Sequence, residues 1–294
     1  MNISPAFRQY ISTVLERNKV SASKIINIQN LSGGSVNQVY KLQLQHKSLV
    51  LKVNSHRDFP NMFELEKQGL DCLNGKSDLI IPQVIDRGHF EENSFLILEY
   101  FSKGILGKKF WEEFGRNLAR LHSSTEKLFG LNYDNYIGSL IQKNTKKSDW
   151  ISFFIENRLA FQAQIAFEHK RIDSTTLKML AMLYKRLHNF LPEEKPSLLH
   201  GDLWSGNFLV SKNGHAVLYD PAIYYGHREM DISMSLLFGG FHSTFYKAYH
   251  EYLPLESNWE ERVDICNLYP LLVHVNLFGS SYTSRFKSVL KQFV

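Results

Sequence analysis

The chain has 294 residues, 44% of them hydrophobic and 13% aromatic, which is enough for a large core in two lobes or two domains. No run approaches the roughly 18 apolar residues of a membrane span, and the N-terminus lacks the layout of a secretory signal, so we expect a cytoplasmic protein with no membrane partner. The two cysteines, Cys72 and Cys266, are far apart and lack a C-x-x-C partner, which argues against a disulfide framework or a zinc site.

The net charge of +5 is concentrated near the N-terminus, since residues 1–60 hold eight lysines and arginines against two acids. Solvated surface side chains explain most of this excess, and a basic lobe that helps to hold a triphosphate is also consistent with it. The rest of the chain is close to neutral, so we expect no nucleic-acid partner.

The first third of the chain has the pattern of a helix followed by a sheet. Proline at the first helical position after Ser4, with apolar residues at helical spacing, predicts an accessory N-terminal helix. A second helix is predicted over residues 61–73. Runs rich in Val, Ile and Leu predict antiparallel strands over residues 25–31, 36–44, 48–53, 84–90 and 94–100.

Between the first two strands lies a glycine pair, Gly33 and Gly34, followed by Ser35. Glycines let backbone amides approach a phosphate closely. A plain hairpin turn explains the pair equally well, because the full G-x-G-x-x-G pattern is missing.

Lys52 lies in the third strand, and Glu66 lies on the following helix, fourteen residues later. A strand lysine held by a helix glutamate is the arrangement of kinases, in which the lysine pairs with the nucleotide phosphates. Glu64 is the rival partner, and a merely exposed glutamate is the other alternative.

The last strand of this region ends at Glu99, Tyr100 and Phe101. We interpret this segment as an interlobe hinge, where backbone groups of Glu99 and Phe101 bind an adenine edge, although an ordinary strand end has the same pattern. Glycines at positions 104 and 107 mark the boundary between lobes. We therefore expect a nucleotide-binding lobe over residues 1–101 and a catalytic and substrate lobe over residues 102–294.

Helical periodicity dominates the rest of the chain. His122 lies on the apolar face of the first of these helices, and we interpret it as a packing residue and not a catalyst. Residues 124–148 are polar and loop-like. Further helices are predicted over residues 150–167, 174–191, 228–238, 241–253 and 258–278.

The stretch over residues 198–220 carries the chemistry. Asp202 is followed by Asn207 five positions later and by Asp220 eighteen positions later. In kinases such an aspartate orients the acceptor hydroxyl, the asparagine holds one Mg²⁺ and the second aspartate holds the metal that bridges the nucleotide phosphates. Short strands around an Asn-Gly turn are predicted between Asn207 and Asp220. A solvated acidic turn is the alternative, which the flanking pattern disfavours.

Other chemistries lack their motifs. The sequence contains no H-E-x-x-H, no G-x-S-x-G and no Walker A loop. The expected fold is therefore α+β and bilobal, like that of protein kinases. Its N-terminal lobe is a five-stranded antiparallel sheet with a helix equivalent to helix C of kinases, and its C-terminal lobe is mainly helical.

Four motifs extend the pattern: H-G-D-L-W-S-G-N at 200–207, D-P-A at 220–222, Y-Y-G-H-R-E-M-D at 224–231 and L-F-G-G-F at 237–241. Together they resemble the fructosamine (ketosamine) kinases, within the kinase-like phosphotransferases that include the aminoglycoside kinases. The resemblance covers roughly residues 28–285 and favours Glu66 over Glu64. It also includes residues 134–138, Gln142, Asn144, Trp150, Arg158, Pro254, Leu255, Trp259, Arg262 and a final L-L-V-H-V-N-L-F-G.

This resemblance implies ATP-dependent phosphorylation of the 3-hydroxyl of a ketosamine, such as a ribulosamine or fructosamine on a small amine or a protein lysine, in the repair of glycated amines. It implies that Asp202 orients the hydroxyl and that Asn207 and Asp220 ligate Mg²⁺. Trp204 is either a platform for the sugar or an interlobe packing residue. Asp231 is a candidate acid for a substrate cation.

Three departures from protein kinases affect regulation. Gly201 replaces the arginine of H-R-D, Pro221 and Ala222 replace the Phe-Gly of D-F-G, and no A-P-E follows. Without that arginine a phosphorylated activation loop has no obvious partner, so we expect a constitutively competent enzyme. The glycine loop has no cysteine, which argues against a redox switch there.

Two alternatives to a ketosamine kinase remain. One is a phosphotransferase for another hydroxylated amine, of the aminoglycoside or choline type. The other is a catalytically silent nucleotide-binding protein, which the presence of Lys52, Asp202, Asn207 and Asp220 disfavours. A monomer is the default expectation.

Overall fold

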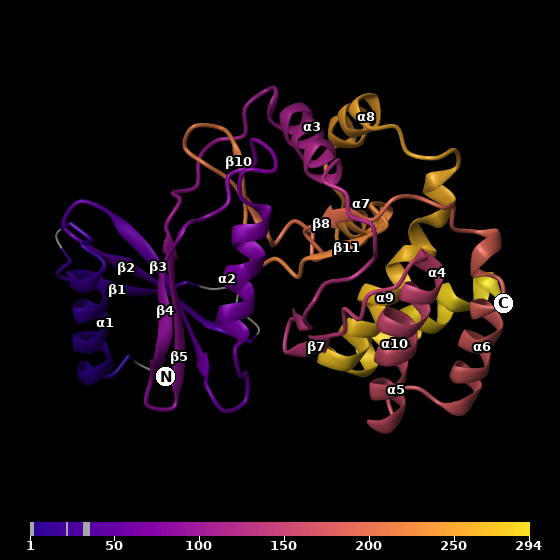
Figure 1. Ribbon diagram of the computed structural model, residues 1–294, viewed down its shortest axis with the longest axis horizontal. Helices are drawn as coiled ribbons and strands as arrows, with labels where there is room; N and C mark the ends of the chain where they lie inside the picture. The colour runs from indigo at the N-terminus through magenta and orange to yellow at the C-terminus, as the bar shows by residue number, and fades with distance from the viewer. Residues whose placement is uncertain (1–2, 22, 32–35) are drawn as a thin grey trace.

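The structure is a computed structural model, and it describes residues 3–21, 23–31 and 36–294. Strands and helices are segregated along the chain: the N-terminal part is built on one antiparallel sheet, and the C-terminal part is mainly helical (Figure 1). The expected α+β, bilobal fold class is confirmed.

The N-terminal sheet has the strand order β1-β2-β3-β5-β4, and every neighbouring pair is antiparallel. Its strands are β1 (Asn27–Leu31), β2 (Gln38–Gln43), β3 (Ser48–Ser55), β4 (Val84–Phe90) and β5 (Asn93–Glu99).

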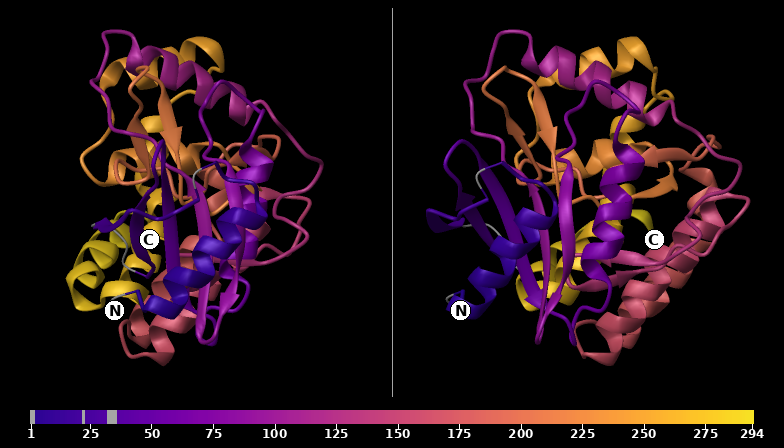
Figure 2. Two further views of the ribbon diagram at one scale, coloured as in Figure 1. Left: turned by 90° about the vertical axis from the view of Figure 1, so that its left-hand side faces the viewer. Right: turned by 60° about the vertical axis from the view of Figure 1, so that its left-hand side comes forward.

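Successive side chains of β5 alternate between two cores, as the period of a strand requires. Phe95 and Ile97 pack with helix α1 (Pro5–Arg17), whereas Leu96 and Leu98 pack with helix α2 (Met62–Leu73). The two helices therefore cover opposite faces of the sheet (Figure 2). The predicted N-terminal helix is present, and Ser4 caps it by accepting a hydrogen bond from the Phe7 N–H.

The core around Leu96 and Leu98 continues into the C-terminal lobe, where it includes Phe114 and Phe245. The helices of this lobe pack around it and around a second, larger core. They are α3 (Phe110–His122), α4 (Trp150–Phe153), the π-helical η1 (Phe154–Ala160), α5 (Phe161–Glu168), α6 (Ser174–Tyr184), the 3₁₀ turn η2 (Leu187–Asn189), α7 (Glu229–Leu237), α8 (Ser243–Tyr252), α9 (Trp259–Phe278), α10 (Ser280–Leu290) and the 3₁₀ turn η3 (Lys291–Phe293).

Three antiparallel pairs of short strands position the site. They are β6 (Asn135–Ile137) with β7 (Leu140–Gln142), β8 (Ser197–Leu199) with β11 (Tyr224–Gly226), and β9 (Phe208–Val210) with β10 (Ala216–Leu218). Only the last pair was predicted, from its Asn-Gly turn. Three residues are too few to show a strand period, so the other two pairs gave no signal.

Two predictions about the C-terminal lobe were wrong in detail. The polar segment over residues 124–148 contains the β6–β7 hairpin, whose buried positions Asn135 and Gln142 are polar and so gave no hydrophobic pattern. Helix α10 was also not predicted. No helix in the described ranges is long and apolar enough to span a bilayer.

Helices α3 and α8 pack closely at Gly115, where a Cβ would lie 2.2 Å from the carbonyl oxygen of Phe245. Alanine is a better helix former than glycine by about 1 kcal/mol. The clash with backbone outweighs this, so we expect Gly115→Ala to lower the free energy of unfolding by about 1–3 kcal/mol in urea denaturation. Gly107→Ala, with nothing within 4 Å of its Cβ, is the control. Equal stability of the two variants would contradict this packing.

Candidate active site

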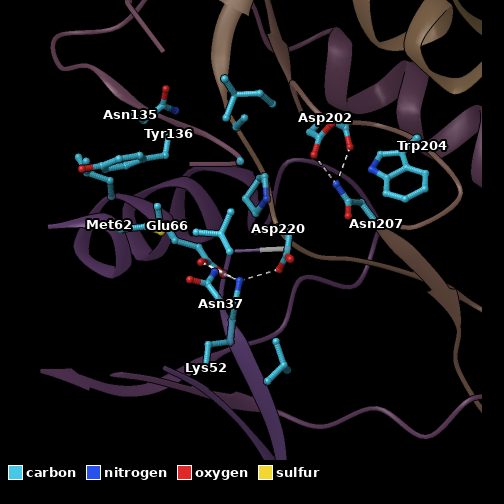
Figure 3. Close-up of a pocket in the computed structure, with 17 residues that line it drawn as sticks. Asn37, Lys52, Met62, Glu66, Asn135, Tyr136, Asp202, Trp204, Asn207 and Asp220 are labelled. Carbon is cyan, nitrogen blue, oxygen red and sulfur yellow. Dashed lines mark hydrogen bonds and ion pairs between the residues drawn. The ribbon is translucent and has the colours of Figure 1, made fainter. Parts of the chain in front are cut away.

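A cleft between the sheet and the helical lobe brings together the polar residues that the sequence singled out (Figure 3). It encloses about 850 Å³, with space open to solvent included. Its walls come from β2, β3, α2, the β6–β7 hairpin and the loops that flank β9 and β10. The lining includes Lys52, Glu66, Asp202, Asn207 and Asp220.

Lys52 on β3 joins the two sides of the cleft. Its Nζ lies 2.7 and 2.8 Å from the carboxylate oxygens of Glu66 and 2.8 Å from Oδ1 of Asp220. The lysine side chain is only 4% exposed, whereas that of Asp220 is 44% exposed. Burial opposes the charge of Lys52, but the carboxylates of Asp220 and Glu66 outweigh it and raise its pKa. The ammonium therefore stays protonated in the cleft.

The structure also distinguishes between Glu66 and Glu64, the two candidate partners of Lys52. Glu64 lies two residues earlier on α2 and pairs with Arg87 of β4. Burial raises the pKa of Glu66, whereas the hydrogen bond from Arg87 lowers the pKa of Glu64. Glu66 is therefore the residue in contact with Lys52.

Asp202 and Asn207 face each other in the loop that follows β8. Nδ2 of Asn207 donates to Oδ2 of Asp202 at 2.7 Å and to the carbonyl oxygen of Asp202 at 2.9 Å. Oδ1 of Asn207, on the opposite branch of the carboxamide, therefore points away from the Asp202 carboxylate. Loss of solvation raises the pKa of Asp202 to about 7, helped by the negative charges of Asp220 and Asp231 and opposed by hydrogen bonds from Asn207 and Trp204.

Gly201, which precedes Asp202, allows the loop to approach the segment after Asp220. Its φ is +82°, and a Cβ at this position would lie 1.9 Å from the carbonyl oxygen of Ala222. The arginine that protein kinases carry here does not fit this backbone.

Asp231 on α7 holds the same loop from beneath. Its carboxylate accepts from the backbone N–H groups of His200 at 2.7 Å and Gly201 at 2.9 Å, and it lies 3.2 Å from Nε2 of His122. The side chain is 1% exposed and its oxygens bind the loop, so Asp231 supports the loop, and the substrate role predicted for it stays a prediction. His122 packs as expected and in addition links Asp231 to Tyr249.

Trp204 lines the cleft beside Asn207 (Figure 3). Its indole packs edge-to-face on Phe238 with ring centroids 5.7 Å apart, and Phe238 lies 4.8 Å from the ring of His274. These neighbours belong to α9 and the end of α7, so Trp204 packs within the C-terminal lobe and not between lobes. His274 also lines a small hollow beside Asp202. His274 was not predicted as a site residue, although it lies in the L-L-V-H-V-N-L-F-G tract.

The residues predicted to bind the nucleotide are only partly found in the cleft. Gly33, Gly34 and Ser35 lie outside the described residues, and the nearby Asn37 lines the cleft. Glu99 uses its N–H and its Oε2 to bind the backbone of residue 83. The hinge role of Glu99, Tyr100 and Phe101 stays a prediction, since the described lining of the cleft does not include them.

The bilobal fold and this cleft define a kinase-like phosphotransferase. A family model described as fructosamine kinase matches residues 7–294, and the chain belongs to this family. It is 38% identical over 289 residues to a probable ketoamine kinase of Enterococcus faecium, covering 96% of this chain and 99% of the relative. It is 37% identical over 283 residues to the chloroplastic protein-ribulosamine 3-kinase of Arabidopsis thaliana, covering 93% and 84%. These relatives identify the protein as a kinase.

Solved structures agree with this family. A crystal structure from Haemophilus somnus 129PT, assigned provisionally as a fructosamine-3-kinase, has a TM-score of 0.88 at 30% identity and covers 97% of this chain and 96% of that chain. An aminoglycoside phosphotransferase has a TM-score of 0.59 at 16% identity, with 96% and 99% covered, and shows the fold alone. The expected kinase-like fold is confirmed.

Glu66→Gln should lower kcat/KM for ATP about tenfold to a hundredfold, because the buried ammonium of Lys52 loses one of its two compensating charges. Steady-state kinetics with varied ATP measures the effect. Glu64→Gln is the matched control on the same helix and should stay within about twofold of the wild type. Equal losses in the two variants would show that Glu66 has no special part in the site.

Proposed function

We propose that this protein transfers the γ-phosphoryl group of ATP to the 3-hydroxyl of a ketosamine, a ribulosamine or fructosamine attached to an amine or a protein lysine. The observation that carries the proposal is the cleft in which Asp202 faces Asn207 while Asp220 contacts Lys52. The kinship to a protein-ribulosamine 3-kinase supports this acceptor class.

On the nucleotide side, Lys52 neutralises the α and β phosphates and Glu66 holds it in place. Asn207 and Asp220 offer the amide and carboxylate oxygens that Mg²⁺ prefers, and Mg²⁺ takes only one or two protein ligands when phosphates supply others. Both side chains line the cleft, and that of Asp220 is 44% exposed to solvent, so they are accessible to an ion. When bound, the ion supplies positive charge at the phosphates.

On the acceptor side, Asp202 accepts a hydrogen bond from the sugar hydroxyl and aligns its oxygen with the γ-phosphorus. A bond forms between that oxygen and phosphorus as the bond to the β–γ bridging oxygen of ATP breaks. The hydroxyl proton passes late to Asp202, because the transition state is loose and asks mainly for positioning. Trp204, with Phe238 and His274 behind it, offers an aromatic wall for one face of the sugar.

The product of this reaction, a ketosamine 3-phosphate, is unstable and releases the free amine. The proposed role is therefore the repair of glycated amines. The 44% exposure of the Asp220 side chain indicates that the cleft is open to solvent, which suits both free and protein-bound acceptors.

The environment of Asp202 predicts the pH dependence of the reaction. Because its pKa is raised to about 7, the ionised fraction of Asp202 falls as the pH drops below 7. We expect kcat/KM for the acceptor to decline about tenfold per pH unit on the acid side, with an apparent pKa near 7. Asp202→Asn should lower kcat by about 10³-fold and leave nucleotide affinity little changed. An acid limb near pH 4 would contradict the raised pKa.

The acceptor class is tested by incubating the protein with Mg-ATP and, separately, ribulose-lysine, fructose-lysine, an aminoglycoside and choline. Phosphorus NMR should show a 3-phosphorylated ketosamine, and chelation of the metal should abolish its formation. Turnover of an aminoglycoside or choline without any ketosamine product would overturn the proposal in favour of a different hydroxylated amine.

A further inference from the structure

A buried polar network beneath the cleft has no part in the mechanism above. Its members are Asn135 on β6, Gln142 on β7, Asn144 just beyond it and Arg158 on η1, and we call these four side chains the amide relay. Each is at most 4% exposed. Burying so many polar groups costs free energy unless their hydrogen bonds are made. The groups that accept and donate these hydrogen bonds therefore indicate what the network does.

The charge of Arg158 has neutral partners. Its guanidinium donates to the carbonyl oxygen of Lys143 and to Oδ1 of Asn144, and its Cζ lies 4.0 Å from the centroid of the Tyr224 ring. Cation–π attraction to Tyr224 helps to compensate the buried charge.

The amide relay has a direction, because a guanidinium can only donate hydrogen bonds. Nη2 of Arg158 donates to Oδ1 of Asn144 at 2.9 Å, which turns Nδ2 of Asn144 toward Oδ1 of Asn135 at 2.8 Å. Nδ2 of Asn135 is then left to donate to the carbonyl oxygen of Ile223 at 2.9 Å. The position of one permanent cation thus sets the orientation of two carboxamides.

Gln142 forms a second branch. The hydroxyl of Tyr269 donates to Oε1 of Gln142 at 2.7 Å, which turns Nε2 toward the carbonyl oxygen of Ala222 at 2.9 Å and toward Oδ1 of Asn135 at 2.8 Å. Two oriented N–H donors therefore reach two successive carbonyl groups, those of Ala222 and Ile223.

These carbonyl groups follow Asp220 by two and three residues. Asp220 has a φ of +55°, a left-handed conformation that non-glycine residues adopt only when the surroundings hold them there. Ala222 also donates its N–H to the carbonyl oxygen of His200 at 2.9 Å, and its own carbonyl packs against Gly201. The amide relay thus acts on the point where the segment after Asp220 meets the catalytic loop.

We propose that the amide relay is a positioning device that holds Asp220 in its metal-binding conformation, so that the site is competent without phosphorylation of an activation segment. The inference rests on the proposed use of Asp220 for Mg²⁺ and is independent of which sugar is the acceptor. It accounts for a buried arginine whose partners named above are neutral, which packing alone does not require.

Asn144→Asp separates positioning from stability. The new carboxylate retains an acceptor for Arg158 and adds an opposite charge, but it replaces one of the two N–H donors to Oδ1 of Asn135 with an acceptor. We expect a melting temperature close to that of the wild type. Mg²⁺ should raise the affinity for ATP, and we expect this increase to be smaller in the variant by about tenfold or more. Calorimetric titration of ATP with and without Mg²⁺ measures this gain, and the Mg²⁺ concentration for half-maximal turnover should rise in parallel.

Two further variants complete the experiment. Gln142→Glu removes the donor to Ala222 directly and should show the same loss, even where Asn144→Asp fails to fold. Asn276→Asp is the matched control, because this buried amide bonds only within the helical core, to Gln162, and should leave Mg²⁺ dependence unchanged.

Folded Asn144→Asp or Gln142→Glu protein whose Mg²⁺-dependent gain in ATP affinity lies within about twofold of the wild type would overturn the inference. A wild type without any Mg²⁺-dependent ATP binding would overturn both the inference and the proposed function. Intact Mg-ATP binding without ketosamine turnover would overturn the proposed acceptor and leave the inference about the amide relay standing.

Discussion

The site depends on one buried cation. The ammonium of Lys52 is 4% exposed and needs both Glu66 and Asp220 to compensate its charge. These three residues come from a strand of the sheet, a helix on its face and the loop after β10, so the ion pairs tie the orientation of α2 to the C-terminal lobe. Separation of the lobes here would remove Asp220 and leave Glu66 as the remaining carboxylate beside the buried ammonium, so the Lys52–Asp220 ion pair holds the two sides of the cleft together.

Below the cleft, buried polar groups hold the catalytic backbone. Asp231 binds the N–H groups of His200 and Gly201, and the amide relay binds the carbonyl groups of Ala222 and Ile223. The amide relay thus donates to the carbonyl oxygens of the segment after Asp220. The carboxylate of Asp231 accepts from the N–H groups of the catalytic loop. Regulated protein kinases orient the equivalent segments through an arginine and a phosphorylated loop. Here the supporting groups are permanent parts of the core, which suits an enzyme without a phosphorylation switch.

The proposed acceptor side is built differently, from aromatic rings on the C-terminal lobe. Trp204, Phe238 and His274 come from the catalytic loop, the end of α7 and the last part of α9, and neighbouring rings in this series lie 4.8 to 5.7 Å apart. Burial lowers the pKa of His274, and its Nδ1 is 2.7 Å from the carbonyl oxygen of Pro270. A neutral histidine behind an indole offers a sugar both an apolar face and a hydrogen-bond acceptor.

The sequence by itself determined the class of protein and the charged core of the site. Spacing along short segments showed Asp202, Asn207 and Asp220, and strand and helix periods placed Lys52 and its two candidate partners, because local geometry governs these features. The choice of Glu66 over Glu64 came from the family resemblance. Only the tertiary structure decided that Asp231 supports the loop, that His274 joins Trp204, and that Asn135, Gln142, Asn144 and Arg158 form one network. Their contacts span up to 127 residues of sequence, as between Gln142 and Tyr269, and buried polar partners leave no periodic pattern to read.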